Sequence, residues 1–203
     1  IQYTTTVQPL TLSEPTTASK PESVTAVLSD ADIKTAVDQF NEIRRSVKPT
    51  ASNMLELVWD PVLAEIAKNY TSKCVFDYNE VYMSDYSIGY TSVDADIKTA
   101  VDQFNLSEAI TGWANERHRY TYGSNHCPRY CGNYKQIIWA ETYAVGCSIT
   151  ACKEVFGPYN SGPRNLIVCN YGPGSSWYNP YIPGPSASAC PTGYRPKNKL
   201  CSN

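Results

Sequence analysis

The sequence predicts an α+β protein held together by disulfide bonds, and three observations support this. Apolar residues follow a helical period in three stretches, near residues 30–47, 60–72 and 107–120. Three short runs rich in Ile, Val, Tyr and Trp are typical of strands, at 135–139, 144–150 and 165–171. The 203-residue chain also contains eight cysteines, an even number that permits complete pairing.

The first expected helix covers residues 30–47. Its apolar face recurs at steps of three and four residues, at Ile33, Val37, Phe40 and Ile43. Ser29 or Asp30 can accept hydrogen bonds from the free N–H groups of the first turn. Pro49 ends the pattern, because proline has no backbone N–H and its ring clashes with the preceding turn.

Two further helices are expected. One begins at Asp60-Pro61, because a capping side chain followed by proline at the first helical position is a typical helix start, and it runs to about residue 72. The other covers residues 107–120, with Ile110, Trp113 and Ala114 on its inward face.

Residues 1–29 differ in composition from the rest of the chain. Fourteen of these 29 residues are Ser, Thr or Pro. Because such a segment has little apolar area to bury, we expect an extended arm. From Gly172 onward the chain is rich in Pro, Gly, Ser and Tyr.

The cysteine content indicates an oxidising compartment, since cytosolic thiols are kept reduced. A structural zinc site is the alternative, but none of the C-x₂-C pairs typical of zinc sites occurs. The sequons at Asn69 and Asn105 also favour secretion and are candidate glycosylation sites. The chain starts at Ile1 without an apolar signal core, so we expect that a signal peptide has been removed.

Charge and hydropathy disfavour two classes of protein. The 17 basic and 19 acidic residues give a formal charge of −2, whereas a nucleic-acid partner requires a basic surface. No run of 18 apolar residues occurs, so we expect no membrane span.

One twelve-residue sequence, DADIKTAVDQFN, occurs twice, at Asp30–Asn41 and at Asp94–Asn105. The flanking residues are unrelated, and the repeat is too short for a solenoid unit. A recent local duplication or an error in the reported sequence would each explain it. Peptide mass spectrometry across residues 86–110 distinguishes the two, because only a genuine second copy yields a spanning peptide.

Several motifs recur in a specific order. The chain contains FNEIRR at 40–45, WANE at 113–116, CGNYKQ at 131–136, VGC at 145–147 and VCNYGP at 168–173. In order and spacing these resemble the CAP superfamily of cysteine-rich secretory proteins, antigen 5 and plant pathogenesis-related class 1 proteins. Within it, the chain looks most like the glioma-pathogenesis-related and peptidase-inhibitor-like branch.

The resemblance implies a three-layer α-β-α sandwich with a small antiparallel sheet. It divides the chain into an arm at 1–29, a CAP domain at 30–176 and a C-terminal extension at 177–203. The pairs Cys74–Cys152 and Cys147–Cys169 would match the disulfides shared in the family. Cys127–Cys131 and Cys190–Cys201 are the remaining natural pairs.

Many CAP domains place two histidines and two glutamates around a cleft, a donor set able to hold a divalent metal. In this sequence Tyr78 and Asn133 stand at the two histidine positions, and Tyr90 stands at the first glutamate position. Only Glu116 is kept. Because phenol and amide groups are poor zinc ligands at neutral pH, we expect a degenerate cleft with no catalytic residue, metal or cofactor.

The two histidines, His118 and His126, are expected to be exposed and structural. The four tyrosines at every fourth position are Tyr78, Tyr82, Tyr86 and Tyr90. This spacing keeps side chains on one face of a strand and near one face of a helix. They could form an aromatic wall that binds a ligand, or they could pack and anchor loops.

The function expected from the resemblance is that of a secreted, non-enzymatic binding protein. Its partner would be an extracellular lipid, such as a sterol or fatty acid, or an extracellular protein. A structural or assembly protein is one alternative, since the arm and the Tyr/Pro-rich extension could reach a neighbouring subunit. A hydrolase or protease is the other. The natural partner and the oligomeric state are not predicted, because a fold does not specify them.

Overall fold

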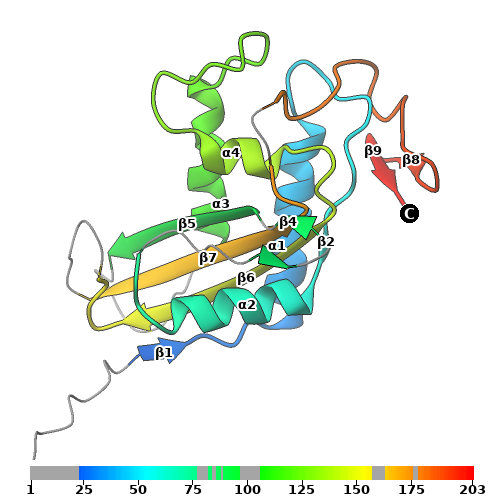
Figure 1. Cartoon of the computed structure of the whole chain (residues 1–203). Helices are drawn as coiled ribbons and strands as arrows, with labels where there is room; N and C mark the ends of the chain where they lie inside the picture. Colours follow the sequence, from blue (N-terminus) through cyan, green and yellow to red (C-terminus); the bar gives the residue numbers. More distant parts are fainter. Residues whose placement is uncertain are drawn as a thin grey trace, which may run out of the picture.

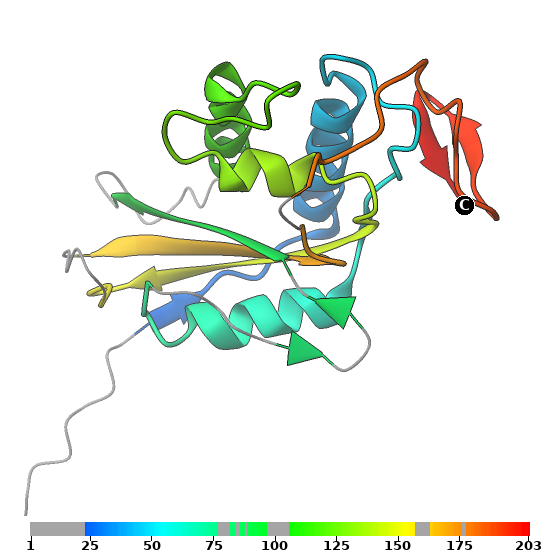
Figure 2. The ribbon, with the colours of Figure 1, turned by 45° about the horizontal axis from the view of Figure 1, so that its top comes forward.

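The computed structural model describes residues 23–76, 82–83, 86–87, 89–96, 106–156, 163–175 and 178–203. In these residues one sheet lies between two layers of helices (Figures 1 and 2). The expected three-layer α-β-α sandwich is therefore confirmed.

The central sheet is built around two long strands, β6 (Ala144–Cys152) and β7 (Arg164–Gly172), which pair antiparallel. The edge of β7 that faces away from β6 pairs with β5 (Gly89–Asp96). The edge of β6 that faces away from β7 pairs with β1 (Ser23–Thr25). The short β2 (Val58–Trp59) runs parallel to β6 along the same edge as β1. The strands expected at 144–150 and 165–171 are confirmed.

Helices cover both faces of this sheet. The helices α1 (Asp30–Arg45), α3 (Leu106–Asn115) and α4 (Gly132–Ile137) lie on one face, and α2 (Pro61–Thr71) lies on the other (Figure 2). The main core lies beneath α1, α3 and α4, and a smaller apolar cluster lies between α2 and the sheet.

The starts of α1 and α2 follow their sequence signals. The Ser29 side chain accepts a hydrogen bond from the Asp32 N–H, and the Asp32 carboxylate accepts one from the Ser29 N–H. The Asp60 carboxylate accepts hydrogen bonds from the N–H groups of Val62 and Leu63. The capping box of α1 and the Asp60 cap of α2 satisfy backbone N–H groups that have no hydrogen-bond partner inside the helix.

The strand expected at 135–139 is wrong, because these residues belong to α4 and the turn that follows it. The mistake has a physical reason. Ile137, Ile138 and Trp139 are all buried, and a short apolar run does not distinguish a buried strand from a buried helix.

The eight cysteines form the four expected disulfides: the two pairs that match the family's shared disulfides and the two remaining pairs, Cys127–Cys131 and Cys190–Cys201. Cys147–Cys169 joins directly opposite positions of β6 and β7. Cys74–Cys152 joins the segment after α2 to the end of β6. No cysteine is free among them, so no structural zinc site can form from these thiols.

Both terminal segments contact the domain. Ser23–Thr25 fall within the segment expected to be an arm, yet they form β1 at the edge of the sheet. In the C-terminal extension, β8 (Arg195–Lys197) and β9 (Leu200–Ser202) form a hairpin closed by Cys190–Cys201. Leu200 is fully buried in the main core.

The two copies of the repeat differ in structure. The first copy forms most of α1, whereas Asp94–Asp96 of the second copy pair with β7 as the end of β5. The rest of the second copy lies outside the described residues. The first copy follows the capping residue Ser29, while the second follows Val93, which has no capping oxygen.

Among the described residues, none of the helices combines the length and the apolar character that crossing a membrane requires.

Candidate functional site

The structure brings together two of the four residues mapped to the family's cleft. Glu116 begins η1 (Glu116–Arg119), which directly follows α3, and only 8% of it is exposed. Its Oε1 accepts a hydrogen bond from Asn133 Nδ2 at 2.8 Å. Its Oε2 accepts one from the backbone N–H of Tyr134 at 3.0 Å. Both carboxylate oxygens are therefore engaged.

The Glu116 carboxylate caps the N-terminus of α4. The residue at the N-cap position of that helix, Cys131, supplies no side-chain hydrogen bond. Glu116 instead accepts the N–H of Tyr134 in the first turn, where a negative charge also interacts favourably with the helix dipole. The kept glutamate thus has a structural role in positioning α4.

Burial raises the pKa of Glu116, and hydrogen bonds from Tyr134 and Asn133 oppose this effect only in part. A carboxyl group in this environment can accept hydrogen bonds or hold a proton. Metal binding needs several donors, and within the described ranges no three His, Cys, Asp or Glu residues are grouped so that they could hold a metal ion.

The other mapped residues are placed as follows. Tyr90 lies in β5, opposite Asn170 of β7. Tyr78 lies outside the described residues, as does the candidate glycosylation site Asn105. Asn69, the other glycosylation candidate, lies exposed on α2.

His118 and His126 are both exposed, as expected. His118 follows Glu116 by two residues in η1, but the histidine faces solvent while the glutamate is buried. The two side chains therefore do not form a common site.

The tyrosines at every fourth position do not lie on one helix or one strand. Tyr82 belongs to β3 (Tyr82–Met83) and Tyr86 to β4 (Tyr86–Ser87), and these two strands pair antiparallel as a hairpin. Tyr90 lies in a third strand, β5. The expectation of a shared face on one element is therefore wrong, because the chain reverses direction between Tyr82 and Tyr86.

A different group of tyrosines lies beside Glu116 and was missed by sequence reasoning. Tyr120 and Tyr134 meet edge to face with ring centroids 5.9 Å apart, and Tyr122 and Tyr181 stack at 4.6 Å. Burial is the main cause that raises the pKa of each phenol, that of Tyr120 to about 12. These four side chains therefore remain neutral at physiological pH.

The sequence alone indicates only part of this tyrosine group. Tyr120 and Tyr122 stand two residues apart, but Tyr181 lies 59 residues after Tyr122, whose hydroxyl donates a hydrogen bond to the Tyr181 carbonyl at 2.6 Å. A groove of about 410 Å³ lies beside these tyrosines, and Tyr122, Trp139, Tyr178 and Tyr181 contribute to its lining.

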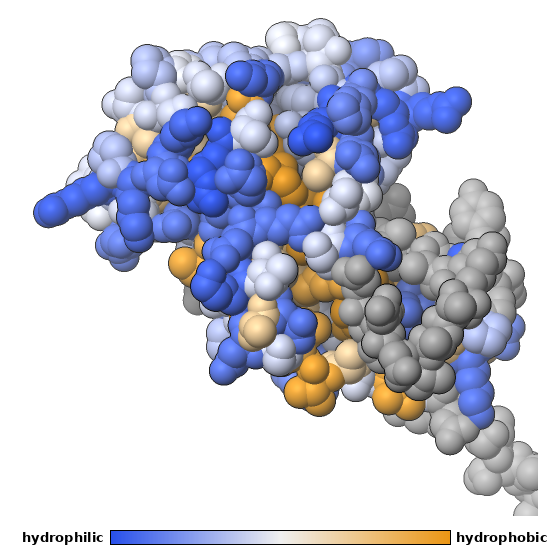
Figure 3. Space-filling view, turned by 180° about the vertical axis from the view of Figure 1, so that it is seen from behind, coloured by the Kyte–Doolittle hydropathy of each residue, from blue (hydrophilic) through white to orange (hydrophobic). Residues whose placement is uncertain are grey.

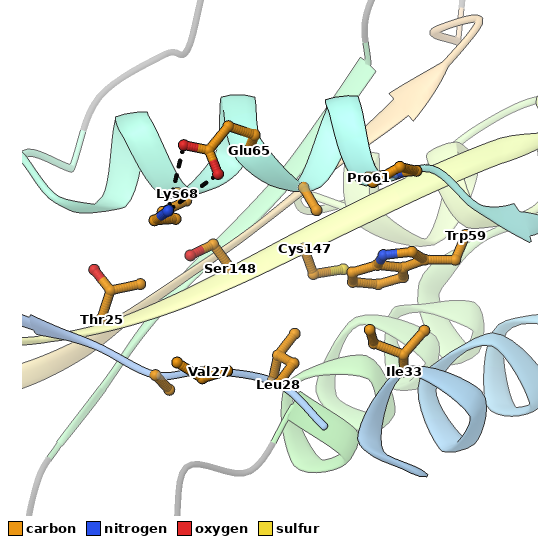
Figure 4. A pocket seen from close by; sticks show the side chains of 12 residues that line it. Thr25, Val27, Leu28, Ile33, Trp59, Pro61, Glu65, Lys68, Cys147 and Ser148 are labelled. Carbon is orange, nitrogen blue, oxygen red and sulfur yellow. Dashed lines mark hydrogen bonds and ion pairs between the residues drawn. The ribbon is translucent and has the colours of Figure 1, made fainter. Parts of the chain in front are cut away.

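A second cavity, of about 270 Å³, lies at the edge of the sheet that β1 and β2 form, between α2 and the start of α1. Its walls come from β1, from the segment joining β1 to α1, from the first turn of α1, and from β2, α2 and β6 (Figure 4). On the face opposite to that of Figure 1, hydrophobic residues form small areas among hydrophilic ones (Figure 3).

The α-β-α fold with its four disulfides is that of a cysteine-rich secretory protein. The CAP family model, described as "Cysteine-rich secretory protein family", matches residues 37–171. The chain belongs to this family.

Curated relatives support the branch as well. Mouse glioma pathogenesis-related protein 1 is 34% identical over 173 residues, which cover 84% of this chain and 64% of that protein. Human GLIPR1-like protein 1 is 33% identical over 191 residues, which cover 92% of this chain and 76% of that protein. Human peptidase inhibitor 16 is also 33% identical over 86% of this chain, but the match spans only 37% of that protein.

Solved structures share the fold. Schistosoma mansoni venom allergen-like protein 4 is 27% identical with a TM-score of 0.60, covering 80% of this chain and all of that one. A crystal structure of NaASP2 with Zn²⁺ is 21% identical with a TM-score of 0.63, covering 86% of this chain and 96% of that one.

Proposed function

We propose that this chain is a secreted, non-enzymatic CAP domain that binds an extracellular lipid, sterol or protein. The observation that carries the proposal is the engagement of Glu116. It is the only mapped acid that remains, and its oxygens accept hydrogen bonds from Asn133 and from the first turn of α4. A carboxylate committed in this way is poorly placed to orient a metal or to activate a water molecule.

Secretion is supported by the four disulfides, which persist in oxidising compartments. The match to a family described as secretory supports it too. Detection of the protein in the medium of expressing cells, with intact disulfides, tests this part of the proposal.

Zinc provides the first test of the cleft. We expect that added zinc leaves the melting temperature unchanged, because the phenol and amide at the mapped positions are poor ligands. NaASP2 has been crystallised with Zn²⁺, so it provides a positive control of the same fold. A zinc-dependent rise in melting temperature that Glu116→Gln abolishes, and that the exposed control Glu141→Gln keeps, contradicts the proposal.

The enzymatic alternative to a binding protein is a hydrolase or protease. Purified protein should not cleave a peptide library. If it does, and if Glu116→Gln removes the cleavage without unfolding the protein, the non-enzymatic proposal is wrong.

Native mass spectrometry with lipid extraction tests the binding function itself. A retained small molecule or a co-purified partner supports binding. A homogeneous high-order oligomer without either favours the assembly alternative.

A further inference from the structure

The groove of about 410 Å³ lies where the C-terminal extension crosses the domain. Three segments far apart in the sequence line it: Tyr122 in the loop after η1, Trp139 to Glu141 in the turn after α4, and residues 178–183 of the extension. Asn53 completes the lining. None of the four residues mapped to the family's cleft is among these described lining residues. The groove is therefore a candidate site separate from that cleft.

The aromatic rings of the groove are held in fixed positions. Tyr122 and Tyr181 stack with ring centroids 4.6 Å apart and planes at 25°, and the Tyr122 hydroxyl donates a hydrogen bond to the Tyr181 carbonyl at 2.6 Å. Trp139 is only 6% exposed, so packing fixes its indole as well. Tyr178 is 79% exposed and offers its ring at the rim. A ligand therefore meets flat apolar surfaces that need little rearrangement.

Polar groups with unused hydrogen-bonding capacity stand among these rings. Asn53 Oδ1 accepts a hydrogen bond from the Ile182 N–H at 2.8 Å, which fixes the amide and leaves its NH₂ group as a donor. In the described part of the chain, no hydrogen bond engages the Trp139 indole N–H, the Asn179 amide or the Glu141 carboxylate. The lining thus provides both donors and acceptors in addition to aromatic surface.

The charges at the groove favour a neutral ligand. Glu141 is the only charged residue among the described lining residues, and it is exposed. The buried guanidinium of Arg44 lies beneath the same turn, because it donates hydrogen bonds to the carbonyls of Ala140 and Thr142, the two neighbours of that glutamate. The carboxylate repels an anionic ligand, and the guanidinium beneath it repels a cationic one. The groove therefore has no excess charge that would select an ion.

The volume of the groove fits one sugar ring. At about 30 Å³ per water molecule, 410 Å³ corresponds to about 14 non-hydrogen atoms. A hexose has about 12 such atoms, whereas four residues of a proline-rich peptide, the other ligand typical of aromatic grooves, have roughly twice as many. The groove therefore accommodates a single sugar unit more readily than a peptide.

A pyranose matches each of these features. Its ring has faces of C–H bonds, which pack on aromatic rings, and a rim of hydroxyl groups, each able to donate and accept. The amides, the indole N–H and the carboxylate of the lining suit those hydroxyls. We propose that this groove binds a single neutral pyranose unit of an extracellular glycan. The inference goes beyond the proposed function and does not depend on it, because a saccharide is neither a lipid nor a protein.

Titration of the full chain with the methyl glycosides of glucose, galactose, mannose and N-acetylglucosamine, followed by saturation-transfer NMR, tests the proposal. At least one glycoside should bind saturably, with a dissociation constant in the millimolar range. The uronic acid analogue of the hexose that binds should bind at least about twofold more weakly, because its carboxylate meets that of Glu141. Glu141→Gln should remove this difference.

Variants locate the site. Tyr178→Ala removes the exposed ring and should weaken binding about threefold or more, whereas Tyr178→Phe keeps the ring and should bind within about twofold of wild type. Asn179→Ala removes an amide and should weaken binding about fivefold. Tyr130→Ala is the matched control, because this exposed tyrosine does not line the groove, and it should leave binding unchanged. Circular dichroism checks that each variant is folded.

Three results overturn the proposal: no saturable binding of any neutral glycoside, wild-type binding by a folded Tyr178→Ala variant, or saturable binding of a tetraproline peptide in place of the sugars. The last result would assign the groove to a proline-rich segment of a protein partner. None of the three bears on lipid binding, which the extraction experiment tests separately.

Discussion

Arg44 is a buried cation on α1 whose guanidinium is held by the backbone. Its six hydrogen bonds all go to carbonyl oxygens, two of them to Leu55 and the others to residues 137, 139, 140 and 142. Burial lowers the pKa of Arg44 to about 9, so the group still carries its charge at neutral pH. One side chain thus connects α1 to the loop before β2 and to the end of α4.

Replacing Arg44 with methionine should lower the free energy of unfolding by at least about 3 kcal/mol, because several buried carbonyls lose their donors at once. Arg44→Lys should cost less, since an ammonium keeps three of the donors. Urea denaturation measures both. A loss below about 1 kcal/mol for Arg44→Met would show that water replaces the guanidinium.

Glu116 makes stability depend on pH. Burial raises its pKa above the usual value of 4.5, so the folded state binds the proton more tightly than the unfolded chain does. The contribution of this group to stability is therefore greatest below its unfolded pKa and decreases as the pH rises through the folded pKa.

Glu116→Gln cannot ionise, so its stability relative to wild type should improve as the pH rises from about 4 to about 7. Thermal melts of both proteins across this range measure the difference. Parallel curves would mean that the hydrogen bonds from Asn133 and Tyr134 fully compensate for burial.

At the scale of elements, α2 lies directly on β6 at Gly146. A Cβ atom at this position would come within 3.0 Å of backbone atoms of Asp60, Leu63 and Ala64. The first turn of α2 therefore approaches the sheet as closely as it does because residue 146 has no side chain.

Gly146→Ala should destabilise the protein by about 1–3 kcal/mol or more, because backbone atoms of the helix must move. Gly112→Ala is the matched control. It lies on the exposed side of α3 with open space around it, and alanine there should stabilise the helix by up to about 1 kcal/mol. Equal effects of the two substitutions would contradict the close approach of α2 to β6.

The elements also explain which parts of the structure could be predicted. The starts of α1 and α2 are determined by neighbouring residues, Ser29 and Asp60, so the sequence predicted them well. The capping group of α4 is Glu116, which stands 18 residues before the N–H that it accepts. No local pattern contains that interaction, and α4 was mistaken for a strand.

At the scale of the whole molecule, family motifs predicted more than periodicity did. They implied the layer order and the disulfides Cys74–Cys152 and Cys147–Cys169, which periodicity alone does not provide. They also mapped Glu116 and Asn133, but not the hydrogen bond between them. The tyrosine group remained hidden because Tyr181 reaches it from the C-terminal extension.

That extension contacts the centre of the domain. Leu200 is fully buried in the main core, and the adjacent Cys201 exchanges backbone hydrogen bonds with the segment before β2, donating to Met54 and accepting from Glu56, each at 2.8 Å. Residues 178–203 should therefore unfold together with the CAP domain rather than as a separate unit.

Leu200→Ala tests this cooperativity. The cavity left in the core should lower the free energy of unfolding of the whole chain by about 2–5 kcal/mol, with coincident transitions by tryptophan fluorescence and far-UV circular dichroism. The exposed control Lys197→Ala in β8 should change stability by less than about 0.5 kcal/mol. If Leu200→Ala instead leaves the main transition unchanged and adds a separate early one, the extension is an independent attachment. The pairing of Cys201 with Cys190 would then stabilise only the extension itself.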